Sequence, residues 1–172
     1  KIILSYHNYT DTPEELDHLY ELMCEMPADV LKIVTYARDI TNNLALFNLI
    51  YRAKRDDKKL IAFCMGERGE ISRILSPLFG GFLTFGSLET GKESAPGQIT
   101  AINLRDIYRV CDKRDSFKIY GLIGNPIHKS MGYLIHNRAF KEIGSSDIYV
   151  PFLVDNVEQS RDPLVPKLLF GS

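Results

Sequence analysis

The sequence predicts an α/β fold built on a parallel sheet. Four short apolar runs alternate with four segments of helical periodicity between residues 2 and 110, and this alternation is typical of βα units. The runs are mostly continuous in apolar residues, as expected for strands that are covered on both faces. Since crossovers between parallel strands are right-handed, two common architectures fit: an open doubly wound sheet or part of a (β/α)8 barrel.

The individual elements follow from these runs. Strands are predicted over residues 2–6, 30–34, 60–64 and 82–85. The first helix is predicted to start with Thr12 as N-cap, Pro13 at the first helical position and Glu15 completing a capping box. Later helices are predicted over residues 42–54, 71–78 and 100–110.

A second group of elements follows a polar stretch. Residues 111–116 are polar and are interpreted as a linker between domains. A strand over residues 117–123, a helix over 132–143 and a strand over 147–154 are predicted after it. The last residues, 160–172, show no clear period and are left unassigned.

Composition excludes several classes of protein. The chain has 172 residues and a formal net charge of −1, so it lacks the basic surplus typical of nucleic-acid binders. No apolar run approaches the roughly 20 residues that span a bilayer. The three cysteines form no CxxC pair, which argues against a disulfide scaffold or a zinc site and favours a reducing compartment. Lys1 opens directly onto an apolar run without a targeting segment, so we expect a piece of a longer protein.

Two residues near the predicted strand ends are candidates for chemistry. His7 follows the first strand, and Lys32 lies inside the second. Burial lowers the pKa of a lysine and makes its amine available as a Schiff-base nucleophile. A lysine at a strand edge with its head in water fits the same pattern, and so does a purely structural histidine. Neighbouring strands lie about 4.8 Å apart, so both side chains can reach one small molecule if their strands are adjacent.

Two further features suit an anion. The loop over residues 91–98 precedes a helix, and it brings Ser94, Gln98 and backbone N–H groups together. An ordinary βα connection explains the same loop. Arg73, shortly after the third predicted strand, suits bidentate contact with a carboxylate, unless it is simply solvated.

Seven sequence blocks carry a family resemblance. Five of them, at residues 5–9 (SYHNY), 31–33 (LKI), 69–73 (GEISR), 84–86 (TFG) and 94–98 (SAPGQ), resemble type I 3-dehydroquinate dehydratases. Two more, at residues 120–127 (YGLIGNPI) and 134–140 (LIHNRAF), resemble the start of a shikimate dehydrogenase. The fused order is similar to the bifunctional shikimate-pathway enzymes of plants, which act in plastids.

The resemblance implies a domain organisation. Residues 1–112 are the C-terminal half, about strands 5–8, of a (β/α)8 barrel, and residues 113–116 are a linker. Residues 117–159 are the beginning of an α/β substrate domain, with 160–172 as a tail outside the family pattern. A half-barrel exposes two sheet edges, so we expect it to be poorly stable on its own.

The resemblance also implies roles for the candidate residues. Lys32 would form the Schiff base with 3-dehydroquinate, and His7 would be the general acid/base. Arg73 would bind the substrate carboxylate, with Ser94 and Gln98 on a loop that closes over the site. The dehydratase needs no cofactor and no metal.

The dehydrogenase family uses NADP and binds shikimate or 3-dehydroshikimate through a Ser-x-Ser pair. Ser130 matches the first serine, whereas Gly132 replaces the second, and no GxGxxG motif is present. We therefore expect no dehydrogenase activity from this chain and weak or absent dehydratase turnover. The resemblance implies small-molecule substrates, and it implies no binding to nucleic acid or to a membrane.

Two alternatives to a dehydratase stay open at this point. One is a non-catalytic product that associates with a complete barrel through its open edge. The other is a class I aldolase-like Schiff-base enzyme, which shares the lysine chemistry but leaves the loop over residues 94–98 unexplained.

Overall fold

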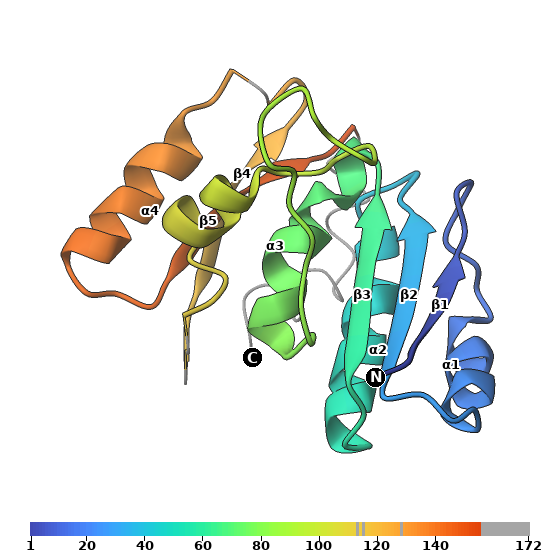
Figure 1. Ribbon diagram of the computed structural model, residues 1–172. Helices are drawn as coiled ribbons and strands as arrows, with labels where there is room; N and C mark the ends of the chain where they lie inside the picture. Colours follow the sequence, from blue (N-terminus) through green and yellow to red (C-terminus); the bar gives the residue numbers. More distant parts are fainter. Residues whose placement is uncertain (113, 115, 128, 156–172) are drawn as a thin grey trace.

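A computed structural model of the protein describes residues 1–112, 114, 116–127 and 129–155. A three-stranded sheet and a two-stranded sheet are both parallel, and helix α3 (Glu70–Phe79) lies between them (Figure 1). The prediction of an α/β fold with parallel strands is therefore confirmed. The unassigned stretch at 160–172 and part of the predicted linker at 113–116 lie outside the described residues.

The three-stranded sheet contains the first three predicted strands. They are β1 (Ile3–His7), β2 (Val30–Tyr36) and β3 (Leu60–Met65), in the order β1-β2-β3. The register places Ser5 of β1 and Ile61 of β3 on either side of Lys32. Lys32 thus lies on the central strand and not at an edge.

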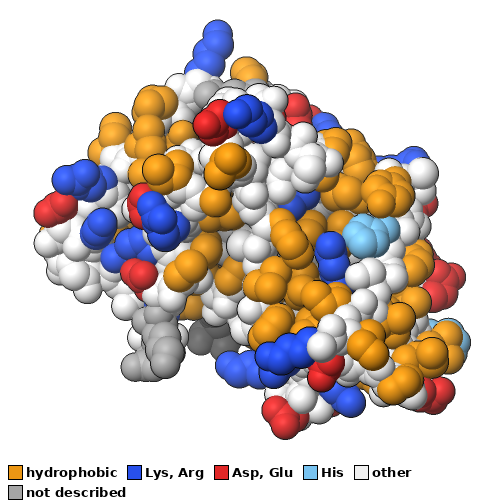
Figure 2. Space-filling view, viewed as in Figure 1, with side chains coloured by type: hydrophobic (Ala, Val, Ile, Leu, Met, Phe, Trp, Pro, Cys, Tyr) orange, Lys and Arg blue, Asp and Glu red, His pale blue; other side chains and the backbone are white. Residues whose placement is uncertain are grey.

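The two faces of this sheet are covered differently. Helices α1 (Leu16–Cys24), α2 (Asn42–Arg55) and α3 pack on one face, where they form the larger apolar cluster with residues such as Ile33 and Ala62. The side chains of alternate residues form a second cluster on the opposite face, namely Val30, Val34, Ile61, Phe63 and Met65. Figure 2 views this helix-free face, on which hydrophobic side chains gather around charged ones.

The start of the first helix differs from the capping-box prediction. Helix α1 begins at Leu16, and neither Thr12 nor Pro13 is part of it. The Thr12 hydroxyl instead donates to the carbonyl oxygen of Tyr36 at 2.9 Å and lies 3.0 Å from the hydroxyl of Thr35. The Thr12 hydroxyl therefore lies against β2, four residues before the helix begins, and it does not cap the helix.

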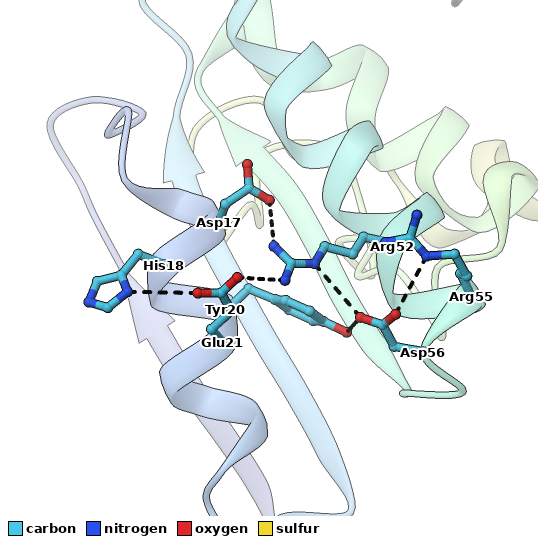
Figure 3. Close-up of polar contacts among 7 residues, drawn as sticks. All are labelled: Asp17, His18, Tyr20, Glu21, Arg52, Arg55 and Asp56. Carbon is cyan, nitrogen blue, oxygen red and sulfur yellow. Dashed lines mark hydrogen bonds and ion pairs between the residues drawn. The ribbon is translucent and has the colours of Figure 1, made fainter.

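A network of polar contacts joins α1 to α2 (Figure 3). Arg52 of α2 donates to Asp17 at 3.0 Å and to Glu21 at 2.7 Å, both on α1. Arg52 also lies 3.7 Å from Asp56, which accepts a hydrogen bond from the Tyr20 hydroxyl. The network ties the helix beside the edge strand to the rest of the fold.

The predicted fourth strand at residues 82–85 is wrong. A strand needs a repeated ladder of hydrogen bonds, but here the Phe82 N–H donates to the Leu60 carbonyl (2.8 Å) and the nearest β-bridge joins Ser87 to Thr100. Gly81 precedes the run, and a Cβ there would lie 2.8 Å from the Ser76 carbonyl oxygen. The chain is held close to α3 at this point, so it follows the edge of β3 without forming a ladder with it.

The predicted helix over 100–110 is shorter and more loosely wound. Residues 101–107 are helical, with a π-helix at Asn103–Ile107. The Tyr108 N–H donates to the Asn103 carbonyl, which is the wider π-type bond, and the chain leaves the helix at Arg109 with φ of 52°. The apolar periodicity thus predicts the position of the helix, but it does not distinguish a π-helix from an α-helix.

The two-stranded sheet contains the remaining elements. Strand β4 (Ile119–Gly124), helix α4 (Gly132–Glu142) and strand β5 (Ile148–Leu153) lie within one or two residues of the predicted elements. Ile119 and Val150 belong to the larger apolar cluster that also contains the helices of the first sheet. The two sheets therefore share one core.

Polar contacts also connect the two parts of the fold. Arg68, in the short helix η1 (Glu67–Gly69), donates to the carboxylate of Asp155, which also accepts a hydrogen bond from Asn125. Arg114 donates to the Ser146 carbonyl at 2.7 Å. Arg114 belongs to the predicted linker, and its side chain is anchored to the second sheet.

Candidate active site

A cavity of about 220 Å³ opens on the helix-free face of the three-stranded sheet. Residues from all three strands, from α3 and from the loop after residue 86 line it. They are His7, Tyr9, Lys32, Val34, Phe63, Met65, Arg73, Phe85, Ser94, Ala95 and Gln98. The structure thus brings the five residues predicted for a dehydratase site to one cavity. Their chemical roles remain predictions.

Lys32 points into this cavity from the middle of β2. Alternation along the strand buries Leu31 and Ile33 against the helices and turns Lys32 to the other face. Its Nζ lies 4.5 Å from the centre of the Phe85 ring. Burial lowers the pKa of Lys32, and the positive charge of Arg73 lowers it further. Both effects favour the neutral, nucleophilic amine.

His7 approaches the same cavity from the neighbouring strand. It pairs with Val34 in the register, two residues beyond the Ser5–Lys32 pair and on the same face. Its ring stacks on Tyr9, with centroids 5.8 Å apart and planes at 12°. Burial lowers the pKa of His7, with a smaller contribution from the charge of Lys32. His7 and Lys32 thus line one cavity from adjacent strands, and their action on one small molecule stays a prediction.

Arg73 is the most deeply buried charged residue of the cavity. Its side chain comes from the first turn of α3, and the residue is only 1% exposed. The guanidinium carbon lies 4.4 Å from the centre of the Phe63 ring. Burial lowers the pKa of Arg73 to about 10, although Cys64 and Glu70 act in the opposite direction. Arg73 is therefore not the solvated surface arginine that the sequence left open.

The N-terminus of α3 is held against β3 by a buried hydroxyl. Ser72 accepts a hydrogen bond from the Cys64 N–H at 2.8 Å and donates to the Gly69 carbonyl oxygen at 2.6 Å. These two bonds link strand, turn and helix directly beside Arg73. The position of the arginine follows from this local geometry.

The loop that carries Ser94 and Gln98 is internally bonded. The Ser94 N–H and hydroxyl both donate to the Gln98 side-chain oxygen, at 2.8 and 3.2 Å. The Gly66 N–H donates to the Pro96 carbonyl oxygen at 3.1 Å, which ties the loop to the residue after β3. The bonded loop forms one wall of the cavity.

The charge of the cavity is positive. Among its described lining residues, Lys32 and Arg73 are cationic and none is a carboxylate. Phe63, Phe85, Met65 and other apolar groups form the remaining wall. The arrangement suits a small anion that also carries a group reactive toward an amine.

Sequence reasoning missed the aromatic part of the cavity. Tyr9 and Phe85 lie in recognisable blocks but were not predicted as site residues, and Phe63 was predicted only as part of a strand. The signal for Phe63 is its register opposite Val34, two residues from the Lys32–Ile61 pair. This signal can be used only when it is known that β2 and β3 are neighbouring strands.

Ser130 lies in a different cavity, of about 280 Å³, which is lined by residues of η1, β5 and the segment at 90–108 among others. Its hydroxyl accepts a hydrogen bond from the Gly132 N–H at 3.2 Å. Glu70, Tyr133 and Gln98 are among the other lining residues, so Gln98 borders both cavities. The structure does not bring Ser130 together with Lys32.

Two other features are absent from the described residues. Within them, no helix combines the length and apolar character required to cross a membrane. The same part of the chain contains no group of three or more His, Cys, Asp or Glu side chains arranged to hold a metal ion.

Fold and cavity together define an α/β protein with a lysine, a histidine and an arginine at one cationic site. Comparison with known proteins identifies the family. Residues 1–115 match the family described as Type I 3-dehydroquinase, and the chain belongs to that family of enzymes. This membership favours a dehydratase over the aldolase-like alternative.

Individual relatives support the same assignment. The chain is 43% identical over 159 residues to the chloroplastic bifunctional 3-dehydroquinate dehydratase/shikimate dehydrogenase of Arabidopsis thaliana, covering 91% of this chain and 26% of that protein. It is 45% identical over 111 residues to a 3-dehydroquinate dehydratase of Dehalococcoides mccartyi (strain BAV1), covering 63% and 49%. The chain therefore spans about half the length of the bacterial relative and about a quarter of the plant one.

A solved structure supports the fold. The type I 3-dehydroquinate dehydratase of Clostridium difficile superposes with a TM-score of 0.56 at 29% identity, covering 64% of this chain and 44% of that one. The parallel α/β arrangement is thus similar to that of a known member of the family.

Proposed function

We propose that this chain carries the Schiff-base part of a 3-dehydroquinate dehydratase site and converts 3-dehydroquinate to 3-dehydroshikimate. The observation that carries the proposal is the single cavity that joins Lys32, His7 and Arg73. Membership of the type I family and the names of the relatives support the choice of substrate.

The first step needs a neutral amine. The Lys32 Nζ attacks the C3 ketone of the substrate, and loss of water gives a protonated imine. The lowered pKa of Lys32 increases the fraction of neutral amine at neutral pH. A basic, solvent-exposed lysine would remain protonated.

The following steps need a base and an acid. The iminium withdraws electrons and acidifies the neighbouring C2 proton, which His7 removes. His7 has a lowered pKa and is therefore available as the neutral imidazole. The His7 imidazolium then gives this proton to the C1 hydroxyl, the C1–O bond breaks as the C1–C2 double bond forms, and water leaves. Hydrolysis of the imine releases 3-dehydroshikimate and restores the Lys32 amine.

Arg73, Ser94 and Gln98 bind the substrate in this proposal. The Arg73 guanidinium pairs with the substrate carboxylate, because a guanidinium at a cavity whose described lining includes no carboxylate gains from an anionic ligand. Ser94 and Gln98 contribute hydrogen bonds from the loop that borders the cavity. No cofactor takes part in these steps.

The architecture that we propose is the C-terminal half, about strands 5–8, of a (β/α)8 barrel over residues 1–112. Strands β1 to β3 correspond to the first three of these strands in chain order. Residues 113–116 join this part to the start of a dehydrogenase substrate domain at 117–159.

The dehydrogenase activity of a bifunctional enzyme is only partly included in the proposal. In a bifunctional enzyme, Ser130 would contact the carboxylate of shikimate or 3-dehydroshikimate, and NADP would supply or accept the hydride. The described residues 117–127 and 129–155 do not fit NADP, because they form two strands and one helix without a glycine-rich dinucleotide turn. We therefore derive no hydride transfer for this chain. The chloroplastic plant relative supports a plastid location.

The decisive experiment is reductive trapping. The chain is incubated with 3-dehydroquinate and borohydride, which reduces an imine to a stable secondary amine, and the peptides are analysed by mass spectrometry. We expect one adduct on Lys32 and none in Lys32→Met. Absence of label on the wild-type chain, under conditions that label a complete family member, would overturn the proposal.

A second candidate function is association with a complete barrel or another half. It is favoured by the open edge of β1 and by the exposure of Ile3 (49%) and Tyr9 (70%) beside it. Unpaired strand edges are templates for pairing with another chain. Light scattering that finds a monomer, together with no capture by a full-length dehydratase, would exclude this function.

A further inference from the structure

We propose that Phe63 is a positioning residue that holds the Arg73 guanidinium on the face of its ring and thereby keeps the guanidinium N–H donors available for an anionic ligand. The inference rests on the proposed function, because it concerns the anion-binding part of the same cavity. It assigns to a strand residue a task that neither the sequence blocks nor the comparisons assign.

The burial of Arg73 requires a compensating partner. Its side chain is almost fully enclosed, and its Nε has no hydrogen-bond partner among the described residues. Removing a charged group from water is costly unless another interaction offsets the lost hydration. The Phe63 ring provides one, since the guanidinium carbon lies 4.4 Å from the ring centre, well inside the roughly 6 Å range of cation–π attraction.

The Phe63 ring is itself fixed in place. Phe63 is 4% exposed on β3 and packs in the helix-free cluster with Val34, Ile61 and Met65. A ring that is held by a strand and by its neighbours presents a defined face to Arg73. Strand β3 therefore orients the Arg73 guanidinium through Phe63, although Arg73 itself belongs to helix α3.

A second ring completes the arrangement. Phe85 lies edge-on to Phe63, with centroids 6.1 Å apart and planes at 61°, and Lys32 lies over the Phe85 ring. Each of the two cations of the cavity therefore rests on its own ring. The negative faces of the rings offset the repulsion between two positive charges at one small cavity.

The chemical nature of the group beside Arg73 determines whether its N–H donors remain available to a ligand. A carboxylate beside Arg73 would accept its N–H donors and neutralise its charge, and it would compete with the ligand. A ring face attracts the cation without accepting these in-plane donors. Phe63 thus stabilises Arg73 while leaving its hydrogen-bonding capacity for a carboxylate. Leucine or methionine would fill the space but provide no ring face.

The test replaces the ring and keeps the packing as far as possible. Phe63→Leu and Phe63→Met both remove the ring, and methionine adapts well to irregular gaps. Phe47→Leu is the matched control, because Phe47 is fully buried on α2 and packs against Phe79 outside the cavity. All variants are first compared with the wild type by circular dichroism and thermal unfolding.

The first readout is the concentration of 3-dehydroquinate that half-saturates borohydride trapping on Lys32. We expect it to rise about three- to tenfold in both Phe63 variants, with the same maximal labelling. The control should keep the wild-type value. A purely structural role would lower the labelled fraction in all three variants and leave the half-saturating concentration unchanged.

The second readout does not depend on the reaction. In protein labelled with ¹³C,¹⁵N-arginine, NMR should show a ring-current shift of the Arg73 guanidinium that is lost in both Phe63 variants and kept in Phe47→Leu. Titration with quinate, which has an alcohol where the substrate has its ketone and forms no imine, should move the Arg73 signal with a dissociation constant about three- to tenfold higher in the Phe63 variants.

The two readouts separate the two proposals. Failure of trapping in the wild type, with an intact quinate response and its dependence on Phe63, would overturn the proposed function and support the positioning role. Folded Phe63 variants with the wild-type quinate affinity would overturn the positioning role. A wild-type Arg73 signal that ignores quinate would overturn it as well.

Discussion

A Cβ atom on Gly97 would lie 2.1 Å from the carbonyl oxygen of Gly66. Gly97 also has φ of +71°, a conformation that other residues adopt only under strain. The loop that carries Ser94 and Gln98 is thus seated on the residue after β3 by a contact that only glycine permits. The closeness of this loop to the cavity depends on one residue without a side chain.

The first prediction concerns this contact. Gly97→Ala should lift the loop from Gly66 and displace Ser94 and Gln98 from the cavity. We expect the half-saturating concentration of 3-dehydroquinate in the trapping assay to rise about tenfold or more, as for other mispositioned binding groups. The apolar core is not touched, so the unfolding temperature should fall only slightly.

Gly91 offers a matched control in the same loop. It also has a positive φ, of 82°, but nothing lies within 4 Å of a Cβ placed there. Gly91→Ala therefore adds the backbone strain, about 1–2 kcal/mol, without the clash. Equal effects of the two substitutions on trapping would contradict the proposed seating of the loop.

The second prediction concerns the network between α1 and α2. Arg52 lowers the pKa of Glu21 below its ordinary value of 4.5, first by a hydrogen bond and then by its charge. A depressed carboxyl pKa adds stability above the unfolded-state pKa, and this stability is lost as the pH falls through the folded-state value. Arg52→Gln should remove this part of the acid sensitivity.

The measurement is thermal unfolding of both proteins between pH 7 and pH 3. At pH 7 the variant should melt a few degrees lower at most, because both side chains reach solvent. The difference should shrink toward pH 3. Arg138→Gln, which removes a single exposed pair with Glu142 on α4, is the control. A constant difference at every pH would argue against the assigned role of Glu21.

The fold could be predicted wherever one local pattern decided the structure. The apolar runs around Ile33 and Ala62 indicated strands because apolar side chains predominate in both of them, with Lys32 as the exception. The run at 82–85 has the same composition, but hydrogen bonding depends on a neighbour, and the contact of Gly81 with α3 determines its path. Thr12 could either cap the first helix or contact β2, and the sequence does not decide between the two. The structure shows that its hydroxyl donates to the carbonyl oxygen of Tyr36.

The candidate site divides in the same way. Lys32 and His7 were predictable, because a charge inside an apolar run and a histidine after a strand are visible in the sequence. Phe63 was not, because an aromatic residue in a strand looks like any other core residue. Its importance arises from the Arg73 guanidinium, which reaches it from α3.

The third prediction concerns the cysteines. Burial raises the pKa of the Cys64 thiol to about 11, although its hydrogen bonds with Thr35 and Thr12 act against this rise. Cys111 is exposed and Cys24 is partly buried. Because the thiolate is the reactive form, maleimide should label Cys111 first, Cys24 next and Cys64 only after unfolding. Mass spectrometry of peptides from timed samples gives the order, and early labelling of Cys64 would contradict the described packing.

The last prediction concerns the pH dependence of Lys32. Burial and the charge of Arg73 both lower its pKa from the ordinary value of 10.5, with burial the larger cause. The amine should therefore become reactive at a lower pH than an ordinary lysine, since only the neutral form attacks an electrophile. The folded protein binds this proton more weakly than the unfolded chain does, so the contribution of Lys32 to stability rises with pH between the two pKa values.

The measurement must not depend on anion binding, because Arg73 is proposed to bind the substrate. Acetylation of Lys32 by the neutral reagent p-nitrophenyl acetate, followed by peptide mass spectrometry between pH 6 and pH 11, meets this need. In the wild type the rate should rise with a midpoint below 10.5. In Arg73→Gln the midpoint should move to higher pH and yet stay below the ordinary value, because burial still acts on the amine. Arg68→Gln removes an arginine that pairs with Asp155 outside this cavity, and it should leave the midpoint unchanged. A midpoint that moves equally in both variants, or in neither, would show that the charge of Arg73 does not reach Lys32.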